Sequence, residues 1–170
     1  MQQSHHRHEP SGHRVHAASG TLTRLALAAT AHCLAGCAIG EVLGLVIGLA
    51  LGLGNTSSIA LAVTLAFVFG YAFTLQPLLA GGVPFHMALS LALASDTLSI
   101  TVMEIVDNAV VLVIPGAMDA GLSSPLFWAS LALSLALAFV AALPVNRWLI
   151  SRGRGHAVVH AYHQGAGQGI

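Results

Sequence analysis

Four long apolar runs divide the chain, and polar or helix-breaking residues separate them. The runs cover residues 22–53, 59–79, 85–114 and 125–150. A helix needs roughly 20 apolar residues to cross a bilayer, and each run meets that length. The runs are continuous rather than alternating, which favours helices over the strands of a membrane barrel. The pattern predicts an all-α fold, an integral membrane four-helix bundle.

The connections and the two ends are polar or rich in glycine and proline. Residues 1–21, rich in His, Gly and Ser, are predicted to form a disordered tail, and residues 151–170 a second tail. The predicted turns lie at residues 55–58, at the Gly- and Pro-containing link 80–84, and at Pro115-Gly116.

The placement of arginine predicts the orientation in the membrane. All six basic residues are Arg; three precede or begin the first run, and three end or follow the fourth. The positive-inside rule then places both termini in the cytoplasm, which requires an even number of spans. Trp128 and Trp148, near opposite ends of the fourth run, fit an interfacial aromatic belt.

Composition agrees with a membrane protein. Hydrophobic residues make up 56% of the 170 residues and charged residues 7%, against roughly 25% charged residues in soluble domains. The Arg, Ala, Gly and Leu bias suggests a GC-rich bacterial genome, so the expected location is the bacterial cytoplasmic (inner) membrane. The sequence contains no basic patch that would indicate nucleic-acid binding and no catalytic motif that would indicate an enzyme.

Acidic residues inside the apolar runs are the feature of the sequence that most needs an explanation. They are Glu41, Asp96, Glu104 and Asp107. A carboxylate at the bilayer centre costs at least ~2.5 kcal/mol, and no Arg or Lys in the spans is available as a partner. Either these groups carry a proton or a cation lies among them.

Helical spacing groups these acids with sulfur ligands. Cys33, Cys37 and Glu41 follow one another at every fourth position and share one side of the first span. Spans one and three run in the same direction, so their matched depths predict two polar levels. Cys33, Cys37 and Asp96 form the level nearer the termini, and Glu41, Glu104 and Asp107 the level beyond the midplane.

The third span is predicted to turn a broad polar stripe toward the bundle interior. The stripe consists of His86, Ser90, Thr97, Thr101, Glu104 and Asn108. Asp107 flanks it, Asp96 and Met103 lie further round, and Ser95 and Ser99 are expected to point elsewhere. In the first span, glycine recurs at every fourth position, which predicts close helix packing at Gly36, Gly40, Gly44, Gly48 and Gly52.

These residue types suit metal ions or protons. Thiolates and thioethers bind Cu(I) or Zn(II), and carboxylates bind harder ions and protons. The candidate ligands are Cys33, Cys37, Glu41, Met103, Glu104 and Asp107, with His32, Asp96 and Asn108 as secondary members. Weak metal capture by the tails is expected at His5, His6, His8, His156, His160 and His163.

Readings without a metal remain open. The cysteines can be small packing residues, the glutamates a neutral pair that fixes helix register, and the tail histidines merely solvated. Leu34-Ala35-Gly36-Cys37 also matches a lipoprotein cleavage site, but the preceding tail is long and the following residues stay apolar.

Taken together, AHCLAGCAIGE, GYAFTLQPLL and ASDTLSITVMEIVDN, followed by an arginine-ended fourth span, resemble a bacterial membrane family. It is the uncharacterised four-span family catalogued as domain of unknown function 4396. The resemblance implies a compact four-span bundle and no established activity. The residues that carry it are His32, Cys33, Glu41, Asp96, Glu104, Asp107 and Asn108.

The expected function is metal-ion handling, by transport or delivery, at a buried site between spans one and three. One alternative is a non-catalytic accessory subunit of a membrane complex, in which the glycine ridge docks a partner helix. Another is a proton-coupled carrier of a small solute. The lipid bilayer is an expected partner in each case, together with a second copy of the chain or another membrane protein.

Overall fold

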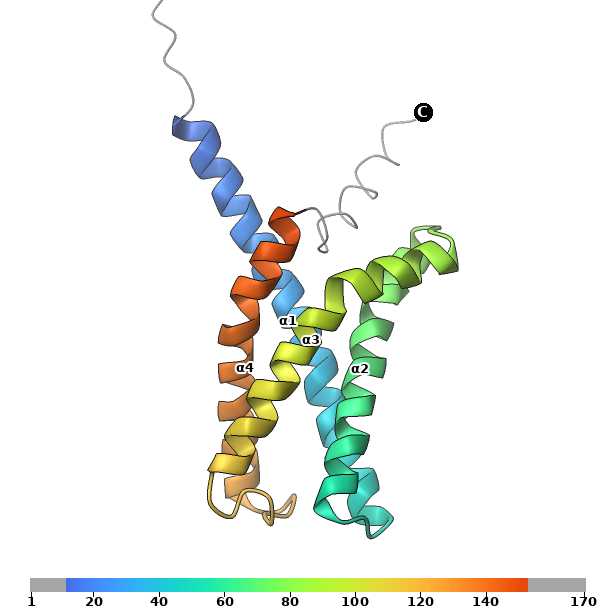
Figure 1. Ribbon diagram of the computed structural model, residues 1–170, viewed down its shortest axis with the longest axis vertical. Coiled ribbons are helices and arrows are strands. Elements are labelled where there is room, and N and C mark those ends of the chain that lie inside the picture. Colours follow the sequence, from blue (N-terminus) through green and yellow to red (C-terminus); the bar gives the residue numbers. More distant parts are fainter. Residues whose placement is uncertain (1–11, 153–170) are drawn as a thin grey trace, which may run out of the picture.

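The computed structural model describes residues 12–152, with side chains from residue 20 onward. It contains four helices, α1 (Gly12–Ala50), α2 (Asn55–Ala80), α3 (Phe85–Val113) and α4 (Pro125–Ser151) (Figure 1). Each contains a segment long and apolar enough to cross a membrane. The described part of the chain is therefore an all-α, multi-pass membrane bundle, as the apolar runs predict.

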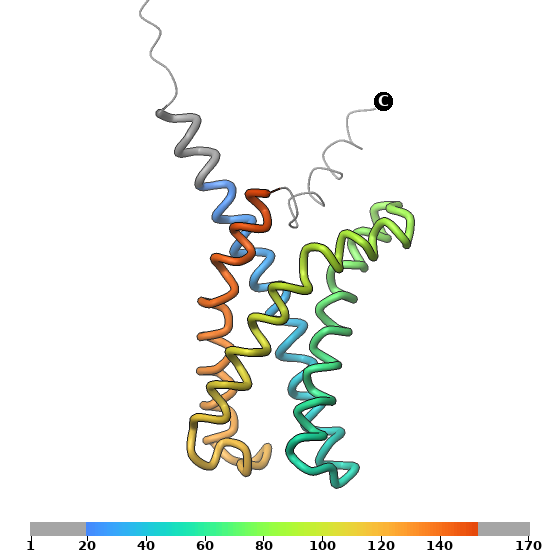
Figure 2. Tube along the Cα trace, in the orientation of Figure 1, coloured from blue at the N-terminus to red at the C-terminus, as the bar shows by residue number. Residues whose placement is uncertain are grey.

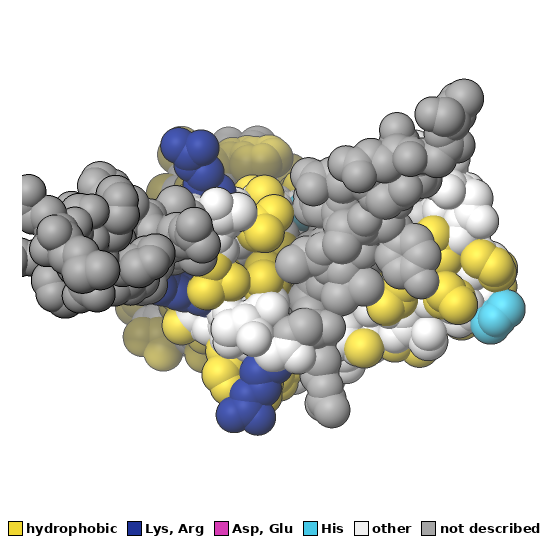
Figure 3. Space-filling view, turned by 90° about the horizontal axis from the view of Figure 1, so that it is seen from above, with side chains coloured by type: hydrophobic (Ala, Val, Ile, Leu, Met, Phe, Trp, Pro, Cys, Tyr) yellow, Lys and Arg dark blue, Asp and Glu magenta, His cyan; other side chains and the backbone are white. Residues whose placement is uncertain are grey.

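The bundle consists of two helical hairpins, α1–α2 and α3–α4, so α1 and α3 run in the same direction (Figures 1 and 2). The α1–α2 turn and the α3–α4 loop lie together at one end, here called the loop end. The start of α1 and the end of α4 lie at the other, the terminal end. Exposed arginines gather there, at Arg24, Arg147 and Arg152 (Figure 3). Which end faces the cytoplasm stays a prediction from the positive-inside rule.

Two of the predicted boundaries are wrong. Helix α1 begins at Gly12, so residues 12–21 are helical rather than part of a disordered tail. No proline follows Pro10 in this region, and nothing in the backbone therefore stops the helix of the first span from extending. Residues 55–58 form the first turn of α2 instead of the link between spans. The link is 51–54, because Gly52 adopts a positive φ of 65° that other residues rarely take.

Helix α1 packs most extensively against α2, through the predicted glycine ridge. A Cβ atom on Gly36 would lie 2.7 Å from the Cα of Gly70, and one on Gly44 would lie 2.7 Å from the Cβ of Ala62. Small residues at every fourth position of α2 complete the seam: Ser58, Ala62, Ala66 and Gly70. Gly52 does not belong to this ridge, because it lies in the turn beyond α1 with no neighbour near its Cβ position.

The outer surface of the bundle is apolar. Side chains such as Ile105, Val113 and Val140 are more than half exposed, as expected for contact with lipid tails. Trp128 and Trp148 are also half exposed near opposite ends of α4. The interior is lined by small and polar residues, which lets the four helices approach closely. The site described next occupies this interior.

Candidate functional site

The polar side of α3 faces the bundle interior through a different set of residues from the predicted stripe. Ser95, Asp96, Ser99, Met103, Glu104 and Asp107 are buried. His86, Ser90 and Thr97 are exposed. The prediction is therefore wrong for the half of the stripe nearer the terminal end, and wrong in turning Ser95 and Ser99 away.

The physical reason is that a hydroxyl group can bond to its own helix. Thr97 donates to the carbonyl of Leu93 at 2.6 Å, and Ser90 donates to the carbonyl of Met87 at 3.0 Å. Such residues can face lipid without leaving a polar group unpaired. A carboxyl group cannot satisfy itself in this way, so the acids decide which face of α3 turns inward.

On the terminal-end side of the acids, the interior contains a hydrogen-bonded cluster, the Asn146 cluster. Asn146 Nδ2 donates to Thr30 Oγ1 at 2.9 Å and to Ser99 Oγ at 2.9 Å. The three residues are 0–4% exposed and come from α4, α1 and α3. The cluster therefore joins three helices at one depth.

Two buried thiols lie between this cluster and the acids. Cys33 neighbours Asp96 and Ser99, and Ser95 donates to Oδ1 of Asp96 at 2.7 Å. One turn along α1, the Sγ of Cys37 lies 4.0 Å from the Sδ of Met103. Both cysteines are free. The structure thus places the sulfur atoms of Cys37 and Met103 side by side, with Cys37 next to Glu104 and Glu41 rather than on a level with Asp96.

Beyond the thiols lies a group of three carboxyls, Glu41, Glu104 and Asp107, here called the acidic floor. Each residue is 5% exposed. The electrostatic neighbours of Glu41 are Asp107 and Glu104, so α1 and α3 contribute to one cluster. Glu41 and Asp107 lie close enough to share a proton, and Glu104 lies beside the thiol of Cys37. No other described side chain or backbone group donates to a carboxyl oxygen of Glu41 or Glu104, or to Oδ1 of Asp107.

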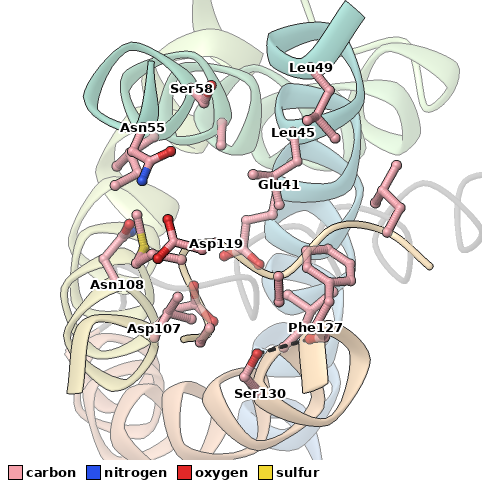
Figure 4. Close-up of a pocket in the computed structure, with 18 of the residues that line it drawn as sticks. Glu41, Leu45, Leu49, Asn55, Ser58, Asp107, Asn108, Asp119, Phe127 and Ser130 are labelled. Carbon is pink, nitrogen blue, oxygen red and sulfur yellow. Dashed lines mark hydrogen bonds between the residues drawn. The ribbon is translucent and has the colours of Figure 1, made fainter. Parts of the chain in front are cut away.

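The acidic floor lies at the inner side of a cavity of about 320 Å³ at the loop end (Figure 4). Glu41, Asp107 and Asp119 point into it, and Asp119 comes from the α3–α4 loop. Asn55 and Asp119 are exposed, so the cavity is accessible from that end. Its walls are mainly apolar: Leu45, Leu49, Leu53, Ile59, Val111, Phe127 and Leu131.

No cationic side chain can neutralise the acidic floor. Between Arg24 and Arg147 the sequence contains no Lys or Arg, and both arginines lie toward the terminal end. Three neighbouring carboxylates repel one another and lose the solvation that water would give them. A proton or a bound cation is needed for this cluster to be stable.

Other predicted ligands lie apart from the acidic floor. His32 is half-buried, and its ring centroid lies 5.5 Å from that of Phe73 on α2. Asn108 lines the cavity and donates to the carbonyl of Glu104 at 2.9 Å. The predicted tail ligands His5, His6, His8, His156, His160 and His163 lie outside the described residues.

The donor geometry does not match a metal site as it stands. Among the residues that the structure describes, no three His, Cys, Asp or Glu side chains lie close enough to hold a metal ion. Structural metal sites need about four ligands at fixed short distances. A metal ion could therefore bind here only if side chains of α1 and α3 moved closer together.

Several interior residues were missed by sequence reasoning. Ser130, Ser134 and Asn146 face inward from α4, and Ser134 neighbours Asp107. Their positions differ by multiples of four, a pattern that could have revealed the inward face of α4. Asp119 could not be identified as a site residue, because nothing in the sequence shows that the α3–α4 loop covers a cavity.

Fold and site together define a four-span membrane protein with an acidic cavity open at one end. The chain belongs to the family described as domain of unknown function (DUF4396), whose sequence profile matches residues 24–155. This match covers all four membrane-spanning segments except the first four residues of the first one and confirms the resemblance noted in the sequence. No curated protein and no solved structure matches the chain.

Proposed function

We propose that the protein handles a cation, by transport or delivery, at the acidic floor of the loop-end cavity. The cation enters from the loop end and takes the place of a proton held among Glu41, Glu104 and Asp107. One proton leaves for each positive charge that enters, so a divalent ion such as Zn²⁺ displaces two protons and the charge of the buried cluster stays constant. The protein therefore acts as a binding and exchange site rather than as an enzyme.

The observation that carries this proposal is the group of three buried, neighbouring carboxyls in a part of the chain that contains no Lys or Arg. A structural pair of acids would be expected to bond to each other's helices or to hydroxyl donors, because unpaired polar groups in a membrane are costly. Ser134 is near Asp107, yet its hydroxyl group donates to the carbonyl of Leu131 at 2.9 Å. Protons or a bound cation must therefore balance the charge of the acids.

A transition metal such as Cu(I) or Zn(II) is a second candidate, favoured by the sulfur atoms. Cys37 and Met103 form a soft pair 4.0 Å apart and next to Glu104. A two-coordinate soft ion between them would need little movement, because thiolate and thioether ligands prefer such ions. Cys33, one turn away, would then be a third ligand.

The accessory-subunit alternative loses its docking surface, because α2 of the same chain covers the glycine ridge. A proton-coupled carrier of a small solute would differ from cation exchange in the solute and in the direction of proton movement. In the carrier, solute and proton move together, whereas in exchange they move in opposite directions.

The test uses the full chain in lipid vesicles that contain a pH-sensitive dye. Adding candidate cations outside, first Na⁺, K⁺, Zn²⁺ and Cu(I), is expected to move protons in the opposite direction for at least one of them. Glu41→Gln should abolish that movement. Asp119→Asn removes an exposed carboxylate from the same cavity and should retain the movement at saturating cation, although more slowly. Leu137→Ala, on the outer surface of α4, is the control that should leave it unchanged. Proton movement that is equal in Glu41→Gln and the wild type would refute the proposal.

A further inference from the structure

The size of the cavity indicates whether its ligand is a bare ion or a larger molecule. Its volume is about 320 Å³, while one water molecule takes ~30 Å³ in the liquid. A bare ion would leave most of that space to water. Ligand pockets begin near ~300 Å³, so this cavity has room for a small organic molecule.

The lining is divided between charge and apolar surface. The acidic floor lies at the inner side, whereas Leu45, Ile59 and Leu131 belong to the walls. The ring of Phe127, on a residue only 7% exposed, also lines the cavity. Apolar and aromatic walls add little to the binding of a hydrated ion. They stabilise a ligand that brings its own apolar surface, and an aromatic face attracts ammonium groups.

The spacing of the acids also favours an organic cation over a metal ion. No three metal-type ligands among the described residues converge on one point. A cation whose charge is spread over an ammonium group and its carbon substituents does not need such convergence. It needs buried negative charge at one side, here the carboxyl groups of Glu41 and Glu104, each 5% exposed.

We propose that the cavity binds a monovalent organic cation with an apolar body, either a protonated amine or a quaternary ammonium compound. The inference rests on the proposed function and specifies its ligand. The ammonium group lies at the acidic floor and the apolar body lies against the walls. One proton leaves the carboxyl cluster as the ammonium group binds, so the charge balances.

The probe is benzyltrimethylammonium, added to the full chain in detergent, with affinity measured by titration calorimetry. Tetramethylammonium is the control that lacks the apolar body. Neopentylbenzene is the uncharged control of the same shape. We expect benzyltrimethylammonium to bind about tenfold or more tightly than either control, equal to about 1.4 kcal/mol per factor of ten.

Variants distinguish the two parts of the cavity. Glu41→Gln should weaken benzyltrimethylammonium by about tenfold or more. Leu45→Ala should weaken it by about tenfold while leaving tetramethylammonium unchanged, because only the apolar contact is lost. Leu137→Ala removes a side chain that is 43% exposed on the outer surface of α4 and should change neither affinity. If Glu41→Gln does not fold, Asp107→Asn replaces it.

The outcomes separate this inference from the proposed function. Binding of Zn²⁺ or Cu(I) that depends on Glu41, with no binding of benzyltrimethylammonium, overturns the organic ligand and leaves cation handling intact. Equal binding of the probe to the wild type and to both acid variants shows partition into an apolar surface and also overturns it. If no cation binds and no proton is released, both proposals fail.

Discussion

Replacing Gly40 by alanine tests the helix packing that positions the site. Gly40 faces α2, and an added Cβ would collide with the backbone N and Cα atoms of Ala66 and lie 2.6 Å from the carbonyl carbon of Leu65. Carbon atoms in contact normally lie ~3.5–4.0 Å apart, so α1 and α2 must separate by ~1 Å. The obstacle is backbone, which cannot rotate aside as a side chain can.

Gly20→Ala is the matched control, because it is the same change on the same helix with no atom within 4 Å of the new Cβ. Alanine favours a helix over glycine by ~1 kcal/mol at both positions. This gain cancels in the comparison, and overpacking costs ~1–3 kcal/mol. We therefore expect Gly40→Ala to be less stable than Gly20→Ala by about 2–3 kcal/mol, toward the upper end of that range.

The assay is reversible unfolding of the detergent-bound protein by sodium dodecyl sulfate, followed by circular dichroism. The two variants are compared at the same protein and detergent concentrations. Equal unfolding free energies for the two variants would mean that α1 and α2 do not meet at Gly40. The arrangement of the acidic floor would then also be in doubt, because α1 carries Glu41.

Other predictions concern the polar interior. Ser99→Ala should destabilise the protein by about 1 kcal/mol in the same unfolding assay, because Asn146 loses a hydrogen-bond acceptor. Ser90→Ala, on the exposed side of α3, should change stability by less than about 0.5 kcal/mol. Similar losses in the two variants would contradict the inward position of Ser99. Cys37→Ala should abolish any tight Cu(I) binding measured by competition with a chelator, and unchanged binding would exclude the sulfur pair. Asp119→Asn should slow cation association in stopped-flow measurements at low salt with little change in dissociation, because an exposed charge mainly steers the ligand; a change confined to dissociation would contradict that role.

The sequence predicts the number and course of the helices well, because length and apolar continuity alone decide which segments can span a bilayer. It predicts the inward side of α1 as well, since Cys33, Cys37 and Glu41 can share only one face. The matched depths of Glu41 and Glu104 follow from the parallel course of α1 and α3.

The orientation of α3 could not be predicted in the same way. Counting every polar residue as inward gives equal weight to Thr97 and Asp96, although only the hydroxyl group can bond to its own helix. The loop-end cavity could not be predicted from the sequence either, because it depends on how the α3–α4 loop folds back over the bundle. Asp119 and Phe127 enter the site only through that three-dimensional arrangement.

The central claim is that the acidic floor exchanges a proton for a cation, and infrared difference spectroscopy tests it most directly. Infrared spectra of the full chain in lipid are recorded before and after addition of a cation that binds. The claim predicts loss of a protonated-carboxyl C=O band in the wild type and in Asp119→Asn, and no such loss in Glu41→Gln. An unchanged carboxyl band on saturation with the cation, or a loss that persists in Glu41→Gln and Asp107→Asn, would contradict it.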